Sequence, residues 1–387
     1  MAELLSVLGA AEGETRYVGG CVRDTLLEVP VSDVDLATRL TPDEVIARLK
    51  QAKIKAVPTG LAHGTVTAIV EGKPVEVTTL RRDVSTDGRH ATVAFTDDWA
   101  EDAARRDFTI NALSADPATL HVHDYFSGWD DVQARRVRFI GDPLTRIAED
   151  HLRILRFFRF YARFAEGAPD EAGLEACAAR ANDLMALSRE RIADELIKLL
   201  ALSDPAPTVA LMVARGILKP VLPEIDAAGA QRLARLVRRE AAAMVPGDPI
   251  RRFAALLPPD PNLADAVGKR LRLSNKAAKR LASAAEQDAE ASPDMLAYRL
   301  GREGAIDRLL LGGGDPGQAA SLLHWERPQL RIGGGTLIAM GLKPGPVVAT
   351  TLQEVQRLWG EAGFPEGGEE QTAIARAAVD KALRDGQ

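Results

Sequence analysis

The stretch that most constrains the fold is residues 17–36, YVGGCVRDTLLEVPVSDVDL, near the start of the sequence. It predicts a short strand, a glycine pair, a short helix over 21–27 and a second strand. Gly19 and Gly20 carry no Cβ, so the chain can turn sharply there and a ligand can approach the backbone closely. The N–H groups that begin the next helix and the guanidinium of Arg23 both suit phosphate oxygens. The stretch therefore predicts a turn that faces a phosphate group.

The second predicted strand carries two acids, Asp33 and Asp35. Residues two apart on a strand point to the same face, so we expect both carboxylates on one side of a sheet. Neighbouring carboxylates repel each other, and a hard divalent cation is the usual physical reason to place them together. A glycine pair alone most often forms a plain turn, and Asp-x-Asp alone is common on exposed strands. Together, in this order and this close, they favour nucleotidyl transfer.

The composition is typical of a soluble globular protein. Of the 387 residues, 46% are hydrophobic and 27% are charged, which predicts two or three domains with a substantial core. No apolar run approaches the ~20 residues that span a membrane, and the N-terminus lacks a signal-peptide pattern. Cys21 and Cys177 are too few for a disulfide scaffold or a zinc site. We expect a cytoplasmic protein with no membrane partner. The net charge of −6 argues mildly against indiscriminate coating of nucleic acid.

Residues 41–80 predict a small mixed sheet with helices on one side. The segment TPDE at 41–44 is a capping box with proline at the first helical position, so a helix should begin there. Three apolar runs predict strands, at 54–57, 65–70 and 75–80.

Glu76 lies in the last of these runs, where Val75 and Val77 face one way and Glu76 the other. A solvated strand face explains this alternation. A third acid at a metal site explains it equally well.

The polar segment 81–95, which contains Gly88, predicts a mobile loop between two ordered parts. It is followed by RRDFTINAL at 105–113. The first three of those residues, taken alone, would indicate only a surface salt-bridge cluster ahead of a buried helix.

Residues 146–164, RIAEDHLRILRFFRFYARF, contain neither glycine nor proline and predict one unbroken helix. Asp150, Arg153 and Arg156 recur on it at three-residue spacing. Acid–arginine pairs at such spacings usually only stabilise a helix, by a few tenths of a kcal/mol each. Here the arginines outnumber the acids Glu149 and Asp150, so we expect unpaired positive charge that is left for a ligand.

From about residue 167 the chain predicts helices separated by short Pro/Gly breaks, and two of these helices are basic. They lie at 231–240 and 268–281. Such runs are often only solvated faces, and contact with RNA phosphate is the alternative. The second run contains the candidate RNA-binding residues, which are Lys269, Arg270, Arg272, Lys276, Lys279 and Arg280.

Three motifs together carry a family resemblance. GGCVRDTL followed by DVDL, then RRDFTINAL, then EDHLRILRFFRF resemble the signatures of class II CCA-adding tRNA nucleotidyltransferases and bacterial poly(A) polymerases. The resemblance covers most of the chain and is most specific over 17–160. It implies an α/β nucleotidyltransferase head, a small mixed sheet with helices, followed by an all-α neck, body and tail. The domains it implies are a catalytic head at 1–140, a neck with the base-recognition and RNA-binding helices at 141–230, and a tRNA-binding body and tail at 231–387.

The resemblance also implies a reaction, the addition of CCA to the 3′ end of tRNA by nucleotidyl transfer from CTP and ATP, with release of pyrophosphate and without a nucleic-acid template. Asp33 and Asp35 would hold Mg²⁺, and Glu76 would be a third catalytic acid. Asp150 and Arg153 would read the edge of the incoming base. The nucleotide-binding residues it implies are Gly19, Gly20, Arg23, Arg106, Asp107, Asn111, Asp150, Arg153, Arg156 and Arg159.

Poly(A) polymerase is the nearest alternative. Those enzymes tend to carry a basic Arg-Arg-Phe stretch where this chain has LAHGTVTAIV at 61–70, which favours CCA addition. An enzyme that adds only CC or only A is less favoured, because CC-only enzymes tend to lack part of the segment 81–95. A catalytically silent RNA-binding protein would be expected to have lost the acids, which are intact here. The sequence leaves the oligomeric state open.

Overall fold

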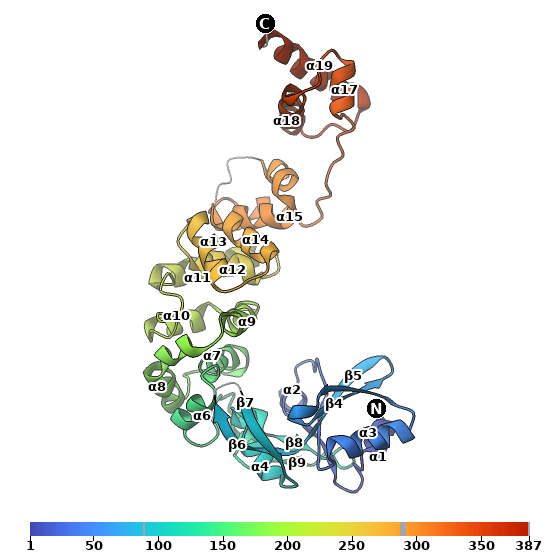
Figure 1. Cartoon of the computed structure of the whole chain (residues 1–387). Helices are drawn as coiled ribbons and strands as arrows, with labels where there is room; N and C mark the ends of the chain where they lie inside the picture. The colour runs from blue at the N-terminus through green and yellow to red at the C-terminus, as the bar shows by residue number, and fades with distance from the viewer. Residues whose placement is uncertain (88–89, 287–291, 386–387) are drawn as a thin grey trace. The chain divides into compact units, whose positions relative to one another are not determined.

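A mixed sheet forms the head of the N-terminal part of the chain (Figure 1). Its strands lie in the order β3-β4-β5-β2-β1-β8-β9. Strands β2 and β5 run parallel, and the other neighbouring pairs run antiparallel. The small mixed sheet that the sequence predicts is thus confirmed. Its strands are β1 (Thr15–Val18), β2 (Asp35–Thr38), β3 (Lys55–Gly60), β4 (Thr65–Val70), β5 (Lys73–Thr79), β8 (Ser114–Ala115) and β9 (Val122–His123).

The computed structural model describes residues 1–87, 90–286 and 292–385. The chain divides into two compact units, Met1–Pro223 and Glu224–Gln387. Gly88, which the sequence assigns to a mobile loop, lies outside the described residues. The expected division into head, neck and body stays a prediction.

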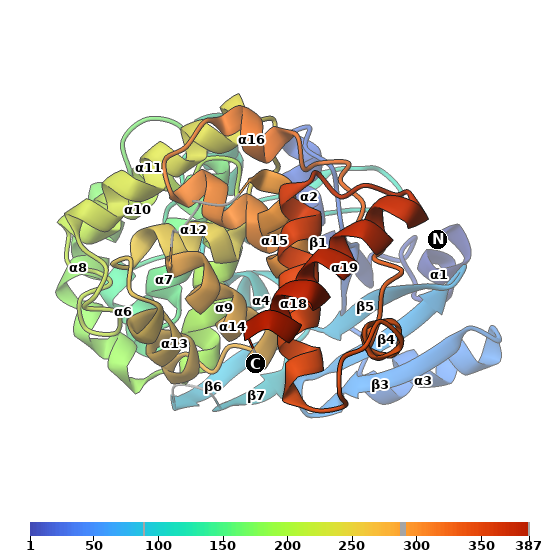
Figure 2. The ribbon, with the colours of Figure 1, turned by 90° about the horizontal axis from the view of Figure 1, so that it is seen from above.

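Two helices cover one face of the sheet, α1 (Ala2–Val7) and α3 (Pro42–Gln51). Figure 2 shows α3 alongside β3. Their apolar side chains pack against Leu36 of β2 and Val77 of β5 in one buried cluster. The predicted capping box at the start of α3 is present, with the Thr41 hydroxyl accepting from the Glu44 N–H and the Glu44 carboxylate accepting from the Thr41 N–H.

The prediction of helices on one side concerned residues up to 80, and a helix that follows them lies on the other face. Helix α4 (Trp99–Ala104) packs Trp99 against Val18 and Ala37 on the other face. These two apolar side chains alternate with Tyr17 and Leu36 along their strands, so they point away from α1 and α3 and need a cover of their own. The sheet face opposite α1 and α3 is therefore covered by α4 at Val18 and Ala37, and it is polar where β2 begins.

Residues 81–87 and 90–95 form the two paired strands of a β-hairpin, so the prediction of a loop is wrong for these residues. Strands β6 (Arg81–Asp87) and β7 (His90–Phe95) pair in a separate two-stranded sheet. Threonine and valine recur in both arms, and these residues favour pleated backbone. At its base the Arg81 guanidinium donates to the His63 carbonyl. Gly64 has φ of +78°, and a Cβ there would lie 2.8 Å from the Phe95 ring.

Short helices complete the N-terminal unit. The α-helices are α2 (Gly20–Leu26), α5 (Gly128–Gln133), α6 (Pro143–Glu149), α7 (Arg153–Phe164), α8 (Glu171–Ala179), α9 (Arg189–Leu200) and α10 (Ala206–Ala214). The 3₁₀ helices are η1 (Leu61–His63), η2 (Thr109–Asn111) and η3 (Ala181–Ala186). Helices α7 and α9 pack against each other (Figure 1).

The single helix predicted over 146–164 is wrong, because it breaks between α6 and α7. Asp150 has extended backbone, with φ −151° and ψ 106°. Its carboxylate accepts from the Leu152 N–H at 3.1 Å. An aspartate that bonds to the backbone two residues on offers an alternative to the helix ladder, and here that alternative wins. The break turns Asp150 away from the direction it would have on a continuous helix.

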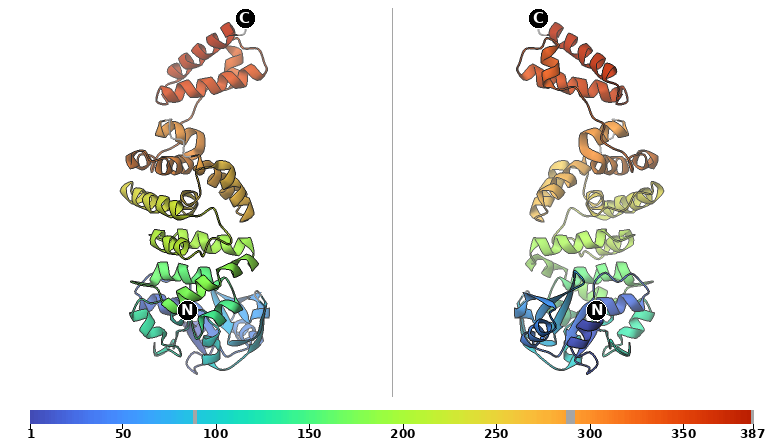
Figure 3. Two further views of the ribbon diagram at one scale, coloured as in Figure 1. Left: turned by 90° about the vertical axis from the view of Figure 1, so that its left-hand side faces the viewer. Right: turned by 90° about the vertical axis from the view of Figure 1, so that its right-hand side faces the viewer.

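The described part of the second unit is helical, as expected of an all-α body and tail. Figure 3 shows its last two helices, α18 and α19, side by side in red. No helix in the described ranges combines the length and the apolar character needed to cross a bilayer. The helices are α11 (Ala227–Ala242), α12 (Pro249–Leu256), α13 (Pro261–Arg270), α14 (Asn275–Ala285), α15 (Pro293–Leu311), α16 (Pro316–Ala320), α17 (Gly334–Ala339), α18 (Pro346–Glu361) and α19 (Gly368–Asp385).

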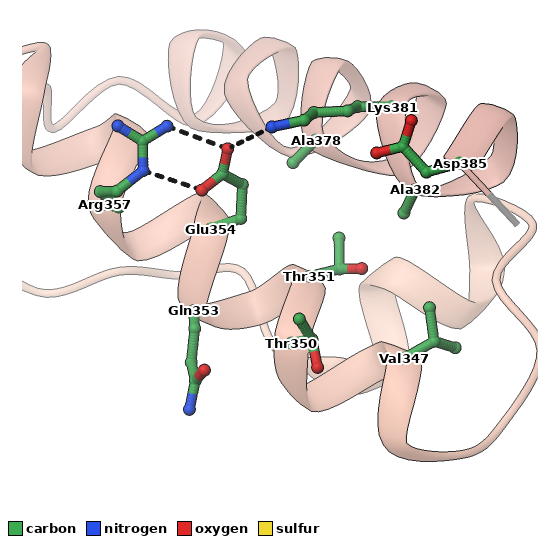
Figure 4. A pocket seen from close by; sticks show the side chains of 10 residues that line it. All are labelled: Val347, Thr350, Thr351, Gln353, Glu354, Arg357, Ala378, Lys381, Ala382 and Asp385. Carbon is green, nitrogen blue, oxygen red and sulfur yellow. Dashed lines mark hydrogen bonds and ion pairs between the residues drawn. The ribbon is translucent and has the colours of Figure 1, made fainter.

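Helices α18 and α19 border a cavity of about 570 Å³ (Figure 4). On its rim the Glu354 carboxylate accepts from Arg357 at 2.8 Å and from Lys381 at 3.2 Å. These charges satisfy one another at the surface. The cavity is lined by Val347, Thr350, Thr351, Gln353, Glu354, Arg357, Ala378, Lys381, Ala382 and Asp385.

An ionic cluster is buried among the body helices. Glu240 accepts from Arg251 and Arg252, both at 2.8 Å. Asp307, whose side chain is fully buried, accepts from Arg251 at 2.9 Å and from Arg280 at 2.7 Å. Each buried charge is paired, which is the condition under which charges are tolerated in a core.

We expect Asp307→Ala to lower the free energy of unfolding by about 3–5 kcal/mol, because buried Arg251 and half-buried Arg280 each lose one of their carboxylate partners. Urea unfolding followed by circular dichroism measures the change. The matched control is Asp265→Ala, which removes the partner of exposed Lys269 and should cost no more than about 1 kcal/mol. Equal losses in the two variants would contradict a stabilising role for the cluster.

The candidate RNA-binding residues differ in their surroundings. Lys269 and Arg270 are exposed and pair with Asp265 and Glu224. Arg280 lies inside the ionic cluster, where its guanidinium is bound by carboxylates, so the geometry gives its predicted RNA contact no support. RNA contact by the others stays a prediction. The remaining members, all exposed, are Arg272, Lys276 and Lys279.

Candidate active site

A sharp turn at Gly19 forms the floor of the site. Gly19 has φ of +69°, a region that favours glycine, and a Cβ there would lie 2.8 Å from an Arg106 guanidinium nitrogen. Arg23 is buried one turn into α2, where Asp24 binds it through two nitrogens at 2.6 and 2.8 Å. Its guanidinium also donates to the Asn111 side-chain oxygen. The glycine turn thus sits between two arginines.

The acids lie next to this turn. Asp35 begins β2 and stands directly opposite Glu76 on the parallel strand β5, so their side chains share the face turned away from α1 and α3. Burial, and then the like charge of Glu76, raise the pKa of Asp35. Asp33 precedes the strand, so the prediction that one strand carries both aspartates is wrong for Asp33. Its carboxylate accepts from the Ser32 hydroxyl at 3.0 Å.

Asp107 anchors the RRDFTINAL motif. Burial alone would raise its pKa, but Arg156 and Asn111 bind the carboxylate and hold the pKa of Asp107 below its usual value. The Arg156 distance is 2.6 Å and the Asn111 distance 3.0 Å. Since Asn111 also binds Arg23, this asparagine links the motif to the glycine turn.

The two arginines that precede Asp107 share Asp102 as a partner but differ in their exposure to the cavity. Arg106 donates to the Asn111 carbonyl at 3.2 Å and to Asp102 at 3.3 Å, and it lines the site. Arg105 pairs with Asp102 at 2.8 Å and does not line the cavity. Sequence adjacency therefore gives no guide to which of them faces a ligand.

The arginines of α7 form the opposite wall, and the expectation of unpaired positive charge there is wrong. Arg153 binds Glu149 and the carbonyls of Arg146 and Arg105. Arg159 binds Glu195 of α9 at 2.6 Å. Glu149 belongs to the stretch 146–164 itself, but Glu195 comes from another helix, which a count of charges along one helix cannot reveal.

One cavity of about 840 Å³ brings these residues together. Sequence reasoning missed Arg191 and Lys198, which come from α9. They are seven residues apart and therefore lie on one face of that helix, which is the signal that could have found them. Glu76 is not among the lining residues, which are Gly19, Gly20, Arg23, Asp33, Asp35, Arg106, Asp107, Asn111, Asp150, Leu152, Arg153, Arg156, Arg159, Phe160, Arg191 and Lys198.

The three acids Asp33, Asp35 and Glu76 provide some, but not all, of the ligands that a hard divalent cation needs. Asp35 and Glu76 share a sheet face, and Asp33 adds to the repulsion that raises the pKa of Asp35. Within the described ranges no three acidic, histidine or cysteine side chains form a complete metal cage. Magnesium usually keeps several water ligands and adds substrate phosphates, so an incomplete carboxylate set suits it.

Carboxylates beside a phosphate-sized turn, faced by arginines, are what transfer of a nucleotide from a triphosphate requires, because that reaction depends on positioning and charge stabilisation. Fold and cavity together define a nucleotidyltransferase.

Comparison with known proteins narrows this class. Residues 15–138 match the poly A polymerase head domain family, and 168–228 match the family described as a probable RNA and SrmB-binding site of polymerase A. The mitochondrial CCA tRNA nucleotidyltransferase 1 of Mus musculus is 34% identical over 387 residues, covering 94% of this chain and 87% of the mouse protein. A CCA-adding enzyme of Oceanobacillus iheyensis is 41% identical over 198 residues, 51% of this chain and 48% of that enzyme.

Among solved structures, the Bacillus stearothermophilus CCA-adding enzyme in complex with CTP superposes with a TM-score of 0.76. It is 26% identical, and the match covers 99% of this chain and 98% of that one. The chain belongs to the CCA tRNA nucleotidyltransferase family.

Proposed function

We propose that this chain adds CCA to the 3′ end of tRNA from CTP and ATP, without a nucleic-acid template and with Mg²⁺. The observation that carries the proposal is the convergence of Asp33 and Asp35 with the arginines of α7 on one cavity. Family membership supports the reaction, and the CTP complex of the Bacillus stearothermophilus enzyme supports the substrate. Enzymes of this family use a divalent metal, and Mg²⁺ is our specific proposal.

In this proposal the acids bind the metal and the arginines bind the triphosphate. Asp33 and Asp35 would hold the metal, with Glu76 as a neighbouring acid on the shared sheet face. A bound Mg²⁺ would supply charge stabilisation at the reacting phosphate and favour ionisation of the RNA 3′-hydroxyl. Arg23 and Arg159 would hold the triphosphate through charge-assisted hydrogen bonds. The triphosphate would also be bound by Gly19, Gly20, Arg106 and Arg156, which line the cavity.

Asp107 acts through its partners in this proposal. Its carboxylate accepts two hydrogen bonds from Arg156, at 2.7 and 2.6 Å, and both residues line the cavity. Asn111 extends the same network to Arg23. A buried, fully bonded network of this kind orients charged groups before the substrate arrives.

Base selection would rest on Asp150 and Arg153. Cytosine and adenine both present an amine donor beside a ring-nitrogen acceptor, while uracil and guanine present a carbonyl beside an N–H. An ionised aspartate only accepts and an arginine only donates, so the pair matches cytosine and adenine and mismatches uracil and guanine. Both side chains line the cavity.

The proposal is tested with purified protein, Mg²⁺ and a tRNA that ends at its discriminator base, given each nucleotide separately and all together. We expect two cytidines and one adenosine, and then a stop. Continued addition of adenosine to unrelated RNA would instead identify a poly(A) polymerase. Addition of CC alone or A alone would identify a single-nucleotide enzyme.

Addition of the final adenosine should depend on the β6–β7 hairpin. The base of the hairpin contacts the head, where Arg81 donates to the His63 carbonyl and the Phe95 ring lies beside Gly64. Removing residues 86–91 should give tRNA that ends in CC, because the pocket no longer adapts from the smaller base to the larger one. Sequencing of the product 3′ ends measures this. Completion of CCA at the wild-type rate would mean that the hairpin is only a connection.

Two further assignments accompany this proposal. We propose a catalytic head at 1–140, a neck at 141–230 and a tRNA-binding body and tail at 231–387, supported by the family matches at 15–138 and 168–228. We also propose a cytoplasmic location, and the mouse relative is named as a mitochondrial protein.

A further inference from the structure

Asp150 is held by two hydrogen bonds from different parts of the chain. It lies in the break between α6 and α7, so its backbone belongs to neither helix. One carboxylate oxygen accepts from the Leu152 N–H at 3.1 Å, and the other accepts from the Arg191 guanidinium at 2.8 Å. Two contacts on two oxygens fix a planar group. Either contact alone would leave it free to rotate.

Arg153, the expected partner of Asp150, is engaged elsewhere. Its guanidinium binds Glu149 and two backbone carbonyls, those of Arg146 and Arg105. Asp150 and Arg153 both line the cavity, but each is held by different partners. The cation that balances Asp150 is Arg191, 41 positions later in the sequence.

Helix stability does not account for Arg191. It is the third residue of α9, which begins at Arg189 after the N-cap Ser188. Cations are disfavoured in the first turn of a helix, because the N-terminal end of the helix dipole is positive. The side chain is only about one-quarter exposed and lines the cavity. Its position is explained by the carboxylate that it binds.

Both members of the base-reading pair keep capacity for a ligand. The carboxylate of Asp150 has about four lone-pair positions, of which the two hydrogen bonds use two. Arg153 has five N–H groups, of which its three hydrogen bonds use three. An incoming base can bind to what remains without displacing Arg191 or Glu149.

We propose that Arg191 is a positioning residue for base selection, which fixes the acceptor face of Asp150 without itself touching the base. This inference rests on the proposed CCA addition and on the role of Asp150 in it. It predicts that Arg191 matters for which nucleotide is used, and that it matters only while Asp150 is present.

The experiment measures kcat/KM for CTP and for UTP on a tRNA acceptor with the full-length protein. Arg191→Ala should lower the CTP-over-UTP ratio about tenfold, corresponding to about 1.4 kcal/mol. Arg191→Lys, which keeps the cation, should restore most of the ratio. In an Asp150→Ala background, adding Arg191→Ala should leave the ratio unchanged within about twofold, because residues that act through one another are non-additive.

The control is Arg215→Ala, which removes an arginine of the same unit that pairs with Glu175 at the surface and does not line the cavity. Its CTP-over-UTP ratio should equal that of the wild type. If Arg191→Ala does not fold, Arg191→Gln is measured in the same assay, and its ratio should lie between those of the wild type and Asp150→Ala.

An unchanged ratio in the Arg191 variants would overturn the inference. So would equal losses for CTP and UTP, since these would show Arg191 binding phosphate or serving only the fold. Additive losses in the double variant would also overturn it. A wild-type protein that adds neither cytidine nor adenosine to tRNA would overturn the proposed function instead, which separates the two failures.

Discussion

Asp35→Asn should reduce nucleotide incorporation on the order of a thousandfold or more, while tRNA affinity changes little. The carboxylate stands opposite Glu76, and burial, followed by the like charges of Glu76 and Asp33, raises the pKa of Asp35, so a bound cation would stabilise the ionised form. Loss of a metal ligand removes several kcal/mol of charge stabilisation at the reacting phosphate, and each 1.4 kcal/mol is a factor of about ten. The side chain keeps its size, so packing is preserved.

Single-turnover incorporation of CTP measures the first quantity, and filter binding of labelled tRNA measures the second. Asp33→Asn should behave in the same way. The matched control is Asp43→Asn, an exposed acid in the first turn of α3 on the same head, whose activity should equal the wild type. Wild-type turnover in Asp35→Asn would exclude a metal role for this residue. A parallel loss of tRNA binding would point to misfolding or to a role in RNA docking.

Asp150→Asn should weaken discrimination between CTP and UTP by about tenfold or more. The amide oxygen can still accept from Arg191, whereas the amide nitrogen cannot accept from the Leu152 N–H and would offer a donor to the base. Uracil, which presents a carbonyl there, loses one of its two mismatches, while cytosine gains one. Each unpaired group costs about 1–3 kcal/mol in a closed site. Arg153 still opposes the uracil ring N–H, so discrimination should fall without reversing.

The measurement is the ratio of kcat/KM for CTP to that for UTP, with thermal melting as a check on folding. Glu175→Gln, which changes an exposed acid of α8 that binds Arg215, should leave the ratio as it is in the wild type. A ratio that is unchanged in Asp150→Asn would mean that base selection lies in other residues and that Asp150 serves only the turn between α6 and α7.

Local sequence was sufficient to predict the elements that form through contacts between residues close together in the chain. The capping box at Thr41 forms because its partners are three residues apart, and the turn at Gly19 forms because glycine accepts a positive φ. The alternation of Val75, Glu76 and Val77 places the acid on the face opposite the core. These signals locate the glycine turn, the neighbouring acids and the arginine row from sequence alone.

The tertiary structure decided which charges meet. Glu195 reaches Arg159 and Arg191 reaches Asp150 only because α9 packs on α7, and separations of 36 and 41 residues leave no periodic trace in the sequence. The same limit explains the wrong prediction of one helix across Asp150. Helix propensity favoured continuation there, and a side-chain hydrogen bond to Leu152, supported from another helix by Arg191, decided against it. Patterns along the chain record which face a residue occupies, and they do not record what lies across from it.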